Sequence, residues 1–208
     1  MIVAIDGPAG AGKSSVARAL SARLGFRYLD TGAMYRALAW LALERGVALD
    51  DEESLAALAR GHPVAFGAGQ SVEIAGVDVT EAIRMPLIDA SVPVVARHPA
   101  VREVMRQRQR ALGELGDSVI EGRDIGVVVV PAAEVKVWLV ADPSVRAERR
   151  HAERDGIDRE ELADELRRRD ERDSANTHRA PDAIEIDTTS LTLDEVIERI
   201  VALVEERR

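Results

Sequence analysis

The sequence predicts an α/β fold in which helices cover a parallel β-sheet. Short apolar runs recur along the 208 residues, and segments with the helical spacing of apolar side chains separate them. Such runs are typical of strands that are buried on both faces of a doubly wound parallel sheet. A glycine-rich loop follows the first run, and a helical pattern follows the loop. The five runs that predict a five-stranded sheet are residues 2–5, 27–29, 119–121, 135–140 and 184–186.

The first and last predicted helices have the clearest apolar faces. Residues 14–24 place Val16, Leu20 and Leu24 on one helical face, so the chain opens as strand, loop and helix. The last helix is expected to start at Thr192 and to pack on the sheet. Its apolar stripe consists of Val196, Ile197, Ile200, Val201 and Val204.

Two segments depart from the alternation of strands and helices. Apolar residues alternate or cluster around glycines in residues 63–66, 72–74 and 77–79, which predicts a small antiparallel insertion of three strands. Residues 146–179 are dense in charge and have few apolar side chains to bury. This second segment is either a mobile flap or a solvated helix with ion pairs between residues four apart.

Composition excludes several classes of protein. The chain has no cysteine, and its four histidines are scattered without metal-ligand spacing, so neither disulfides nor a Cys/His metal site are expected. The formal charge of −9 argues against a general nucleic-acid binder, because such proteins need a broad cationic face. The first apolar run is too short for a signal peptide, and no segment is suited to span a bilayer. We therefore expect a cytoplasmic protein with one main core.

Residues 7–14 match the phosphate-binding loop pattern G-x-x-x-x-G-K-[ST], between a predicted strand and a predicted helix. Backbone N–H groups of such a loop surround phosphates at a helix N-terminus, where the partial positive charge favours anions. Lys13 is expected to reach the β- and γ-phosphates of ATP, and the Ser14 hydroxyl is expected to bind Mg²⁺. The predicted ATP-binding residues are Gly7, Pro8, Ala9, Gly10, Ala11, Gly12, Lys13, Ser14 and Ser15.

The loop alone does not separate a nucleotide switch from a kinase. The chain contains no D-x-x-G sequence, and no N-K-x-D or T-K-x-D guanine motif is possible because its only lysines are Lys13 and Lys136. A GTPase is therefore not expected. A kinase needs a second anion site that faces the first, because phosphoryl transfer depends mostly on positioning and charge neutralisation.

Two further motifs supply candidates for that second site. Residues 30–36 follow the second predicted strand and place Thr31 and Arg36 at the start of a helix. Residues 121–126 lie at the carboxyl end of the third predicted strand, where open α/β sheets bind ligands. Their Arg123 and Asp124 either serve a ligand or form a mutual surface pair.

Four segments together resemble the bacterial cytidylate kinases, and the resemblance covers nearly the whole chain. They are AIDGPAG at residues 4–10, LDTGAMYR at 29–36, EGRDIG at 121–126 and RDxxDS at 169–174. The resemblance implies an adenylate-kinase-like fold with an enlarged monophosphate-binding region and a lid. It also implies transfer of the γ-phosphate of ATP to CMP or dCMP with the help of Mg²⁺.

The resemblance assigns roles to single residues around the acceptor nucleotide. The acceptor phosphate would be held by Thr31, Arg36 and Arg123. The edge of the cytosine base would meet Arg102 and Asp124. The cations that would carry catalysis are Lys13, Arg36 and Arg123.

The resemblance also implies a ribose site and a basic lid. The ribose would bind Asp173, together with Tyr35 and Arg169. The lid over residues 146–179 has more arginines than phosphate contacts require, so only a subset is expected to reach the phosphates. The lid candidates are Arg146, Arg149, Arg150 and Arg154.

The chain departs from the family pattern at two positions. Pro93 stands where the family usually has a serine that contacts the base, and Ser91 lies two positions upstream. Asn176 stands where the family has an arginine, and Arg179 is a candidate substitute.

Two alternative functions remain open on the sequence. The first is a kinase for another acceptor such as UMP, AMP or a small metabolite, although shikimate-type kinases lack the three-strand insertion. The second is a regulatory module that binds a nucleotide without turnover. The missing switch motifs and the clustered arginines weigh against this second alternative.

We expect one kinase domain over residues 1–208, working as a monomer on ATP and CMP or dCMP. Neither a nucleic-acid polymer nor a membrane is expected as a partner. The expected parts are a core (1–30, 112–145 and 180–208), a monophosphate-binding region (31–111, with inserted strands near 63–79) and a lid (146–179).

Overall fold

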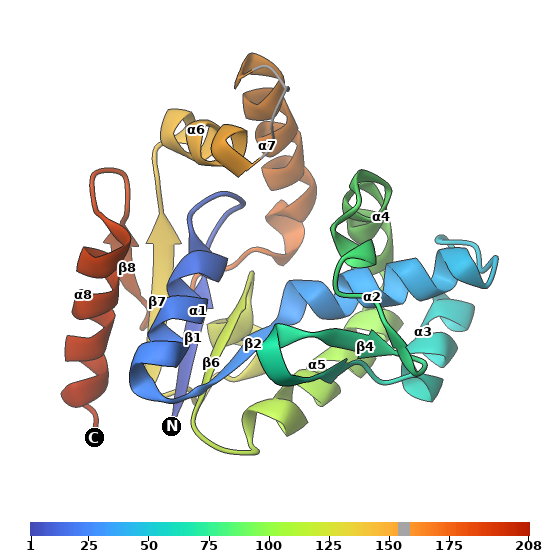
Figure 1. The fold of residues 1–208 in the computed structure, drawn as a ribbon, viewed down its shortest axis with the longest axis horizontal. Helices are drawn as coiled ribbons and strands as arrows, with labels where there is room; N and C mark the ends of the chain where they lie inside the picture. The colour runs from blue at the N-terminus through green and yellow to red at the C-terminus, as the bar shows by residue number, and fades with distance from the viewer. Residues whose placement is uncertain (154–158) are drawn as a thin grey trace. The chain divides into compact units, whose positions relative to one another are not determined.

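The computed structural model describes residues 1–153 and 159–208, which form two compact units (Figure 1). The first unit comprises Met1–Leu29 and Gly113–Arg208, and the second comprises Asp30–Leu112. The division falls close to the limits that we expect for the monophosphate-binding region, residues 31–111. The role of each unit stays a prediction and is taken up below.

A five-stranded parallel sheet forms the centre of the first unit, with the strand order β2-β6-β1-β7-β8. Each strand contains one of the five predicted apolar runs, so the predicted doubly wound α/β fold is confirmed. The strands are β1 (Ile2–Asp6), β2 (Arg27–Asp30), β6 (Ser118–Gly122), β7 (Val135–Val140) and β8 (Ile184–Asp187).

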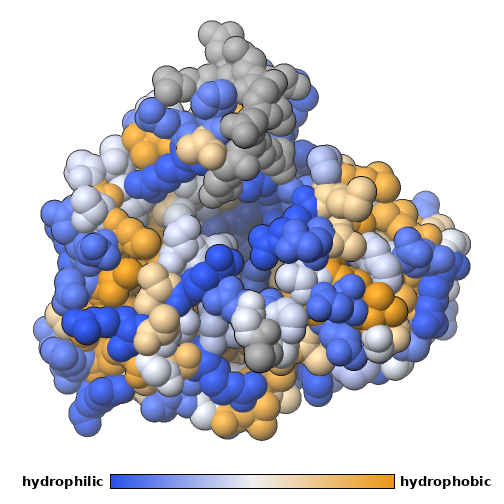
Figure 2. Space-filling view, in the orientation of Figure 1, coloured by the Kyte–Doolittle hydropathy of each residue, from blue (hydrophilic) through white to orange (hydrophobic). Residues whose placement is uncertain are grey.

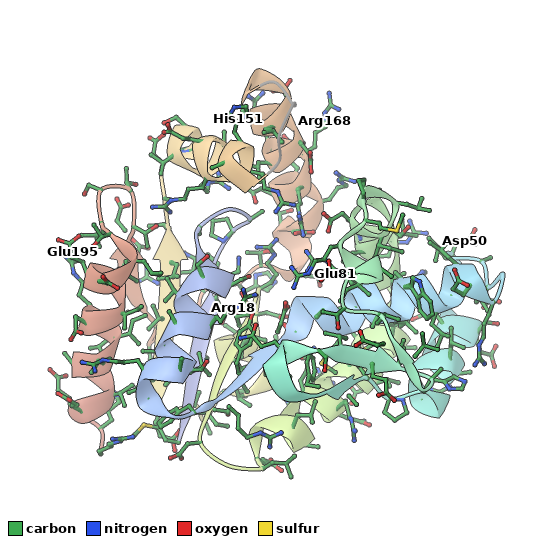
Figure 3. The ribbon with its side chains drawn as sticks, viewed as in Figure 1. Arg18, Asp50, Glu81, His151, Arg168 and Glu195 are labelled. Atoms are coloured by element: carbon green, nitrogen blue, oxygen red, sulfur yellow. The ribbon has the colours of Figure 1, made fainter. Side chains whose placement is uncertain are left out.

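Two helices of this unit contribute to its main hydrophobic core. Helix α1 (Lys13–Leu24) buries Val16 and Leu20, and helix α8 (Leu193–Glu205) buries Val196 and Ile200 in the same cluster. Helix α8 begins after Thr192, as the sequence predicts. The Thr192 hydroxyl accepts a bond from the Glu195 N–H, and the Glu195 carboxylate accepts one from the Thr192 N–H (Figure 3). This reciprocal cap satisfies two N–H groups at the start of the helix.

The charged segment of the first unit contains two helices, α6 (Pro143–Glu153) and α7 (Arg159–Asp173). They pack on each other, and a small apolar cluster joins them to the phosphate-binding loop through Ala147, Leu166 and Ala9. Most other side chains of α7 are polar, and an ion pair of 3.1 Å joins Arg167 to Asp164 on its surface. The segment is thus helical in its described parts, and few apolar contacts attach it to the rest of the unit.

The second unit combines four helices with a small antiparallel sheet. The sheet has the order β3-β4-β5, formed by Ala65–Phe66, Val72–Ile74 and Val77–Asp78, so the predicted three-strand insertion is confirmed. The helices are α2 (Thr31–Glu44), α3 (Glu52–Gly61), α4 (Pro86–Ala96) and α5 (Pro99–Gly113).

Helix α2 is the centre of the second unit, because it contacts α3, α4 and β4. Hydrophobic side chains gather at the surface around α4 (Figure 2), where Met85 and Leu87 are 56% and 63% exposed. Among the described residues, no helix has the length and the apolar character that crossing a membrane requires.

Candidate functional site

The predicted phosphate-binding loop connects β1 to α1 in a conformation that only glycine adopts readily. Gly7, Gly10 and Gly12 have φ angles of 151°, 74° and 88°. A β-carbon at Gly7 would lie 2.3 Å from the carbonyl oxygen of Leu139 in β7, so no side chain fits there. The loop is therefore packed against the sheet and leads directly into the N-terminus of α1.

Lys13 is the first residue of α1, and its side chain is half-buried. The Nζ donates a hydrogen bond of 2.7 Å to the carbonyl oxygen of Pro8. Burial and then the neighbouring charge of Arg123 lower the pKa of Lys13 well below its ordinary value, and Arg169 lowers it further. Glu121 acts in the opposite direction. Phosphates bound at this cluster would stabilise the charged form of Lys13, because they bring negative charge to it.

Ser14 lies next to the carboxylate of Glu121, for which the sequence alone predicts no role. The Ser14 Oγ donates a 2.9 Å bond to Oε2 of Glu121, and the Tyr28 hydroxyl donates a 2.5 Å bond to Oε1 of the same carboxylate. Arg18 lies over the ring of Tyr28, 5.9 Å from its centroid (Figure 3). Glu121 is 3% exposed and lies near the carboxyl end of β6. One oxygen of the acid thus faces the predicted Mg²⁺ ligand, while Tyr28 holds the other.

The described residues contain no group of three or more metal-ligating side chains. A Mg²⁺ ion here would therefore need ligands from the nucleotide in addition to Ser14 and Glu121. This is the usual arrangement, since Mg²⁺ keeps several waters and binds through one or two protein groups and the phosphates of the substrate.

Arg123 connects the loop to the end of α7. Its Nη1 donates a 2.8 Å bond to the carbonyl oxygen of Gly7, and its Nη2 lies 3.0 Å from Oδ2 of Asp173. Arg169 also lies near this carboxylate, with its Nε 3.9 Å from the same oxygen. The alternative of an exposed Arg123–Asp124 pair is not what forms, because Asp124 is buried with 8% of its surface exposed. The first unit thus brings Arg123, Arg169 and Asp173 together beside Lys13.

Of the predicted lid arginines, Arg146 binds to the phosphate-binding loop and Arg149 binds to Thr188. Nη1 of Arg146 donates a 3.0 Å bond to the carbonyl oxygen of Ala9, and it also pairs with Asp170. Asp170 in turn accepts a 3.2 Å bond from the Ala9 N–H. Arg149 donates bonds of 2.9 and 2.6 Å to the hydroxyl and carbonyl oxygens of Thr188.

The other lid arginines differ in position. Arg150 lies on α6 with Arg146 and Arg149, and Arg154 lies outside the described residues. Farther along the segment, Arg168 is exposed on α7 (Figure 3).

The second unit carries the remaining predicted residues on two helices. Asp30 caps α2 by accepting a 2.9 Å bond from the Ala33 N–H, and Thr31 follows it as a buried residue. Tyr35 and Arg36 lie one turn further along α2, and Nε of Arg36 donates a 3.1 Å bond to Asp89 of α4. Arg102, the other predicted acceptor-site residue of this unit, lies in α5.

Ser91 and Arg179, which lie near the positions that depart from the family pattern, have definite bonding partners. Pro93 lies inside α4, and the Ser91 hydroxyl donates a 2.8 Å bond to the carbonyl oxygen of Leu87 in the same helix. Arg179 pairs with Glu185 of β8 at 2.7 Å. The candidate substitute Arg179 and the nearby Ser91 thus both make bonds within their own unit.

Comparison with known proteins gives one consistent result. The model of the family described as cytidylate kinase matches residues 3–206. A cytidylate kinase of Geobacillus sp. (strain WCH70) is 50% identical over 216 aligned residues, which cover 99% of this chain and 96% of the relative. A cytidylate kinase of Bacillus subtilis (strain 168) is 46% identical with the same coverage.

Solved structures agree on the fold at low sequence identity. A shikimate kinase from Bacteroides thetaiotaomicron has a TM-score of 0.51 at 17% identity, with 99% of this chain and 98% of that chain covered. An uncharacterized protein from Eubacterium ventriosum has a TM-score of 0.56 at 14% identity, with 100% and 99% covered.

Proposed function

Because the chain belongs to the cytidylate kinase family, we propose how its residues perform the reaction of that family. The chain is a phosphotransferase that moves the γ-phosphate of ATP to CMP or dCMP and yields ADP with CDP or dCDP. The observation that best supports our residue assignment is the cluster of Lys13, Ser14, Glu121 and Arg123 around the phosphate-binding loop.

The donor nucleotide binds at the loop between β1 and α1. Backbone N–H groups of residues 9–14 surround the phosphates of ATP, and Lys13 neutralises charge on the β- and γ-phosphates. From α6, Arg146 binds the loop carbonyl of Ala9 and Arg149 binds Thr188, and we assign both arginines to the donor side of the lid. Closure of α6 and α7 over bound ATP excludes water, so that the phosphate reaches CMP rather than a water molecule.

The acceptor binds through its phosphate, its base and its ribose. Thr31, Arg36 and Arg123 hold the phosphate, and Arg102 with Asp124 reads the cytosine edge. The ribose contacts are Asp173, Tyr35 and Arg169. Arg123 has a guanidinium group that binds both the loop carbonyl of Gly7 and the carboxylate of Asp173, which suits a group placed between donor and acceptor.

The Ser14 hydroxyl would hold Mg²⁺, and Glu121 would contribute directly or through water. An ion at this place would supply positive charge to neutralise the transferring phosphate. Tyr28 fixes one oxygen of the Glu121 carboxylate and leaves the other to face Ser14. The enzyme works as a monomer in the cytoplasm, with these small nucleotides as its partners.

The identity of the acceptor nucleotide is tested by measuring ADP release with CMP, dCMP, UMP and AMP at equal concentrations. We expect kcat/KM for CMP or dCMP to exceed that for UMP and AMP by at least about 10²-fold, because a site built to hydrogen-bond one base rejects its mismatch strongly. Equal rates with UMP or AMP would contradict the proposed base recognition. ATP binding without ADP release in any of these mixtures would favour the regulatory module instead.

Replacing Glu121 with glutamine is expected to raise the Mg²⁺ concentration needed for half-maximal activity by about tenfold or more, because groups that orient a metal site typically contribute this much. The measurement is kcat at saturating ATP and CMP over a range of free Mg²⁺. Glu185→Gln is the matched control, since Glu185 lies on β8 and pairs with Arg179. A folded Glu121→Gln protein with an unchanged Mg²⁺ requirement would remove Glu121 from the metal site.

A further inference from the structure

The last residue of β1 is a buried carboxylate that the reaction described above does not use. Asp6 directly precedes the phosphate-binding loop and is 4% exposed. Its Oδ1 accepts a 2.8 Å bond from the N–H of Ile125, and its Oδ2 accepts a 2.8 Å bond from the N–H of Gly126. Both oxygens are thus bound to consecutive backbone groups that lie almost 120 residues away in the sequence.

Those two N–H groups begin a short π-helical turn, Ile125–Val129, at the end of β6. The N–H groups that follow bond within the turn, as Val128 does to the carbonyl oxygen of Asp124 at 2.8 Å. The first N–H groups of any helical turn have no partner within it, so they need an acceptor from elsewhere. Asp6 supplies that acceptor from the neighbouring strand.

The backbone that Asp6 holds carries the two residues proposed to meet the acceptor nucleotide. Arg123 and Asp124 directly precede Ile125, and Asp124 has φ −146° and ψ 27°, outside both the helical and the strand regions. The direction of these two side chains depends on how the backbone beside them is restrained. Two bonds of 2.8 Å to the next two residues provide that restraint.

We propose that Asp6 is a positioning residue, whose carboxylate fixes the direction of the Arg123 and Asp124 side chains toward the acceptor nucleotide. This proposal rests on the proposed roles of Arg123 and Asp124. It also explains why the chain keeps a charged group at the end of a buried strand, where an ionised carboxylate is costly.

The charges around Asp6 are consistent with this role. Burial raises the pKa of Asp6 to about 6, and the nearby Asp124 raises it as well. The bonds from Gly126 and Ile125 and the charge of Lys13 oppose this shift. The carboxylate is therefore ionised at pH 8, where both oxygens accept hydrogen bonds, and assays at pH 8 test it in that state.

The test is Asp6→Asn, which keeps the shape of the side chain but turns an N–H donor toward one of the two backbone N–H groups. We expect kcat/KM for CMP to fall about tenfold or more at pH 8, since small displacements of positioned groups are costly. The CMP-to-UMP ratio in kcat/KM should also fall, while KM for ATP stays within about twofold. A purely structural defect would lower kcat/KM for CMP and for UMP alike and would not change the CMP-to-UMP ratio.

Asp6→Glu is the second variant, because it keeps the negative charge near Lys13 but moves the carboxylate by one methylene. It should show the same loss of kcat/KM for CMP and of the CMP-to-UMP ratio, and it carries the test if Asp6→Asn does not fold. Asp187→Asn is the matched control. Asp187 also ends a strand, β8, and accepts a 2.9 Å bond from the Thr189 N–H.

The outcomes separate this proposal from the proposed function. A wild-type enzyme without preference for CMP would overturn the proposed base recognition, whatever the Asp6 variants do. A wild-type enzyme that prefers CMP, together with folded Asp6 variants that keep the wild-type base ratio and KM for CMP, would overturn the positioning role alone. A change in KM for ATP alone would also overturn it, because it would place the effect of Asp6 on Lys13.

Discussion

Replacing Lys13 with alanine is expected to lower kcat for phosphoryl transfer by about 10²-fold or more, because it removes a preorganised charge from the transferring phosphate. The side chain is half-buried, and its Nζ donates a hydrogen bond to the carbonyl oxygen of Pro8. Its loss should therefore leave the fold intact. The measurement is kcat from ADP release at saturating ATP and CMP, with circular dichroism and thermal unfolding as checks on the fold.

Arg23→Ala is the matched control for this substitution. Arg23 lies on the same helix, its side chain is 62% exposed, and its ion pair with Glu198 spans 3.5 Å. Both variants remove one positive charge from α1, but only Lys13→Ala removes it from the loop. Wild-type turnover in a folded Lys13→Ala protein would exclude the loop lysine from the mechanism.

Replacing Asp124 with asparagine is expected to narrow the CMP-to-UMP ratio in kcat/KM by about tenfold or more while lowering activity on CMP. Cytosine presents an N4 amino donor beside an N3 acceptor, whereas uracil presents an O4 acceptor beside an N3–H donor. A carboxylate only accepts hydrogen bonds, so Asp124 suits N4 and repels O4, but an amide can either accept or donate. The measurement is kcat/KM for both nucleotides with each protein.

The control for this substitution is again Asp187→Asn, which should leave the ratio unchanged. An unchanged ratio in Asp124→Asn would exclude this carboxylate from base recognition. The base would then have to be read by other groups. The Ser91 hydroxyl is a poor replacement as it stands, because it already donates to the carbonyl oxygen of Leu87.

Local patterns in the sequence were sufficient for the strands of both sheets and for the first and last helices. The residues 135–140 form β7 as predicted, and α8 begins after Thr192, because apolar runs and a capping residue are local signals. For the charged segment, residues 146–179, the sequence does not decide between a flap and a helix. It forms α6 and α7, whose few buried residues give only a weak periodic signal.

The candidate site was predictable where a motif carries it and not where it depends on which strands are neighbours. The loop with Lys13 and Ser14 is such a motif. The contacts of Glu121 with Ser14 and of Asp6 with Ile125 require β1 and β6 to pair, and no local pattern contains that information. The sequence signals for these two acids are their places at the ends of apolar runs and within the segments 4–10 and 121–126, and neither signal says which groups they bind.

The scarcity of lysine has a consequence for chemical labelling. An acylating reagent reacts with uncharged amines, and the chain offers only its N-terminus, Lys13 and Lys136. The N-terminal amine pairs with Asp117, and Lys136 pairs with Asp182 at 2.8 Å with 9% of its side chain exposed. Lys13 lies in the phosphate-binding loop and has a lowered pKa. A larger fraction of its amine is therefore uncharged, which makes Lys13 a more reactive nucleophile than an ordinary lysine. Acylation of this chain would therefore report on the occupancy of its phosphate-binding loop.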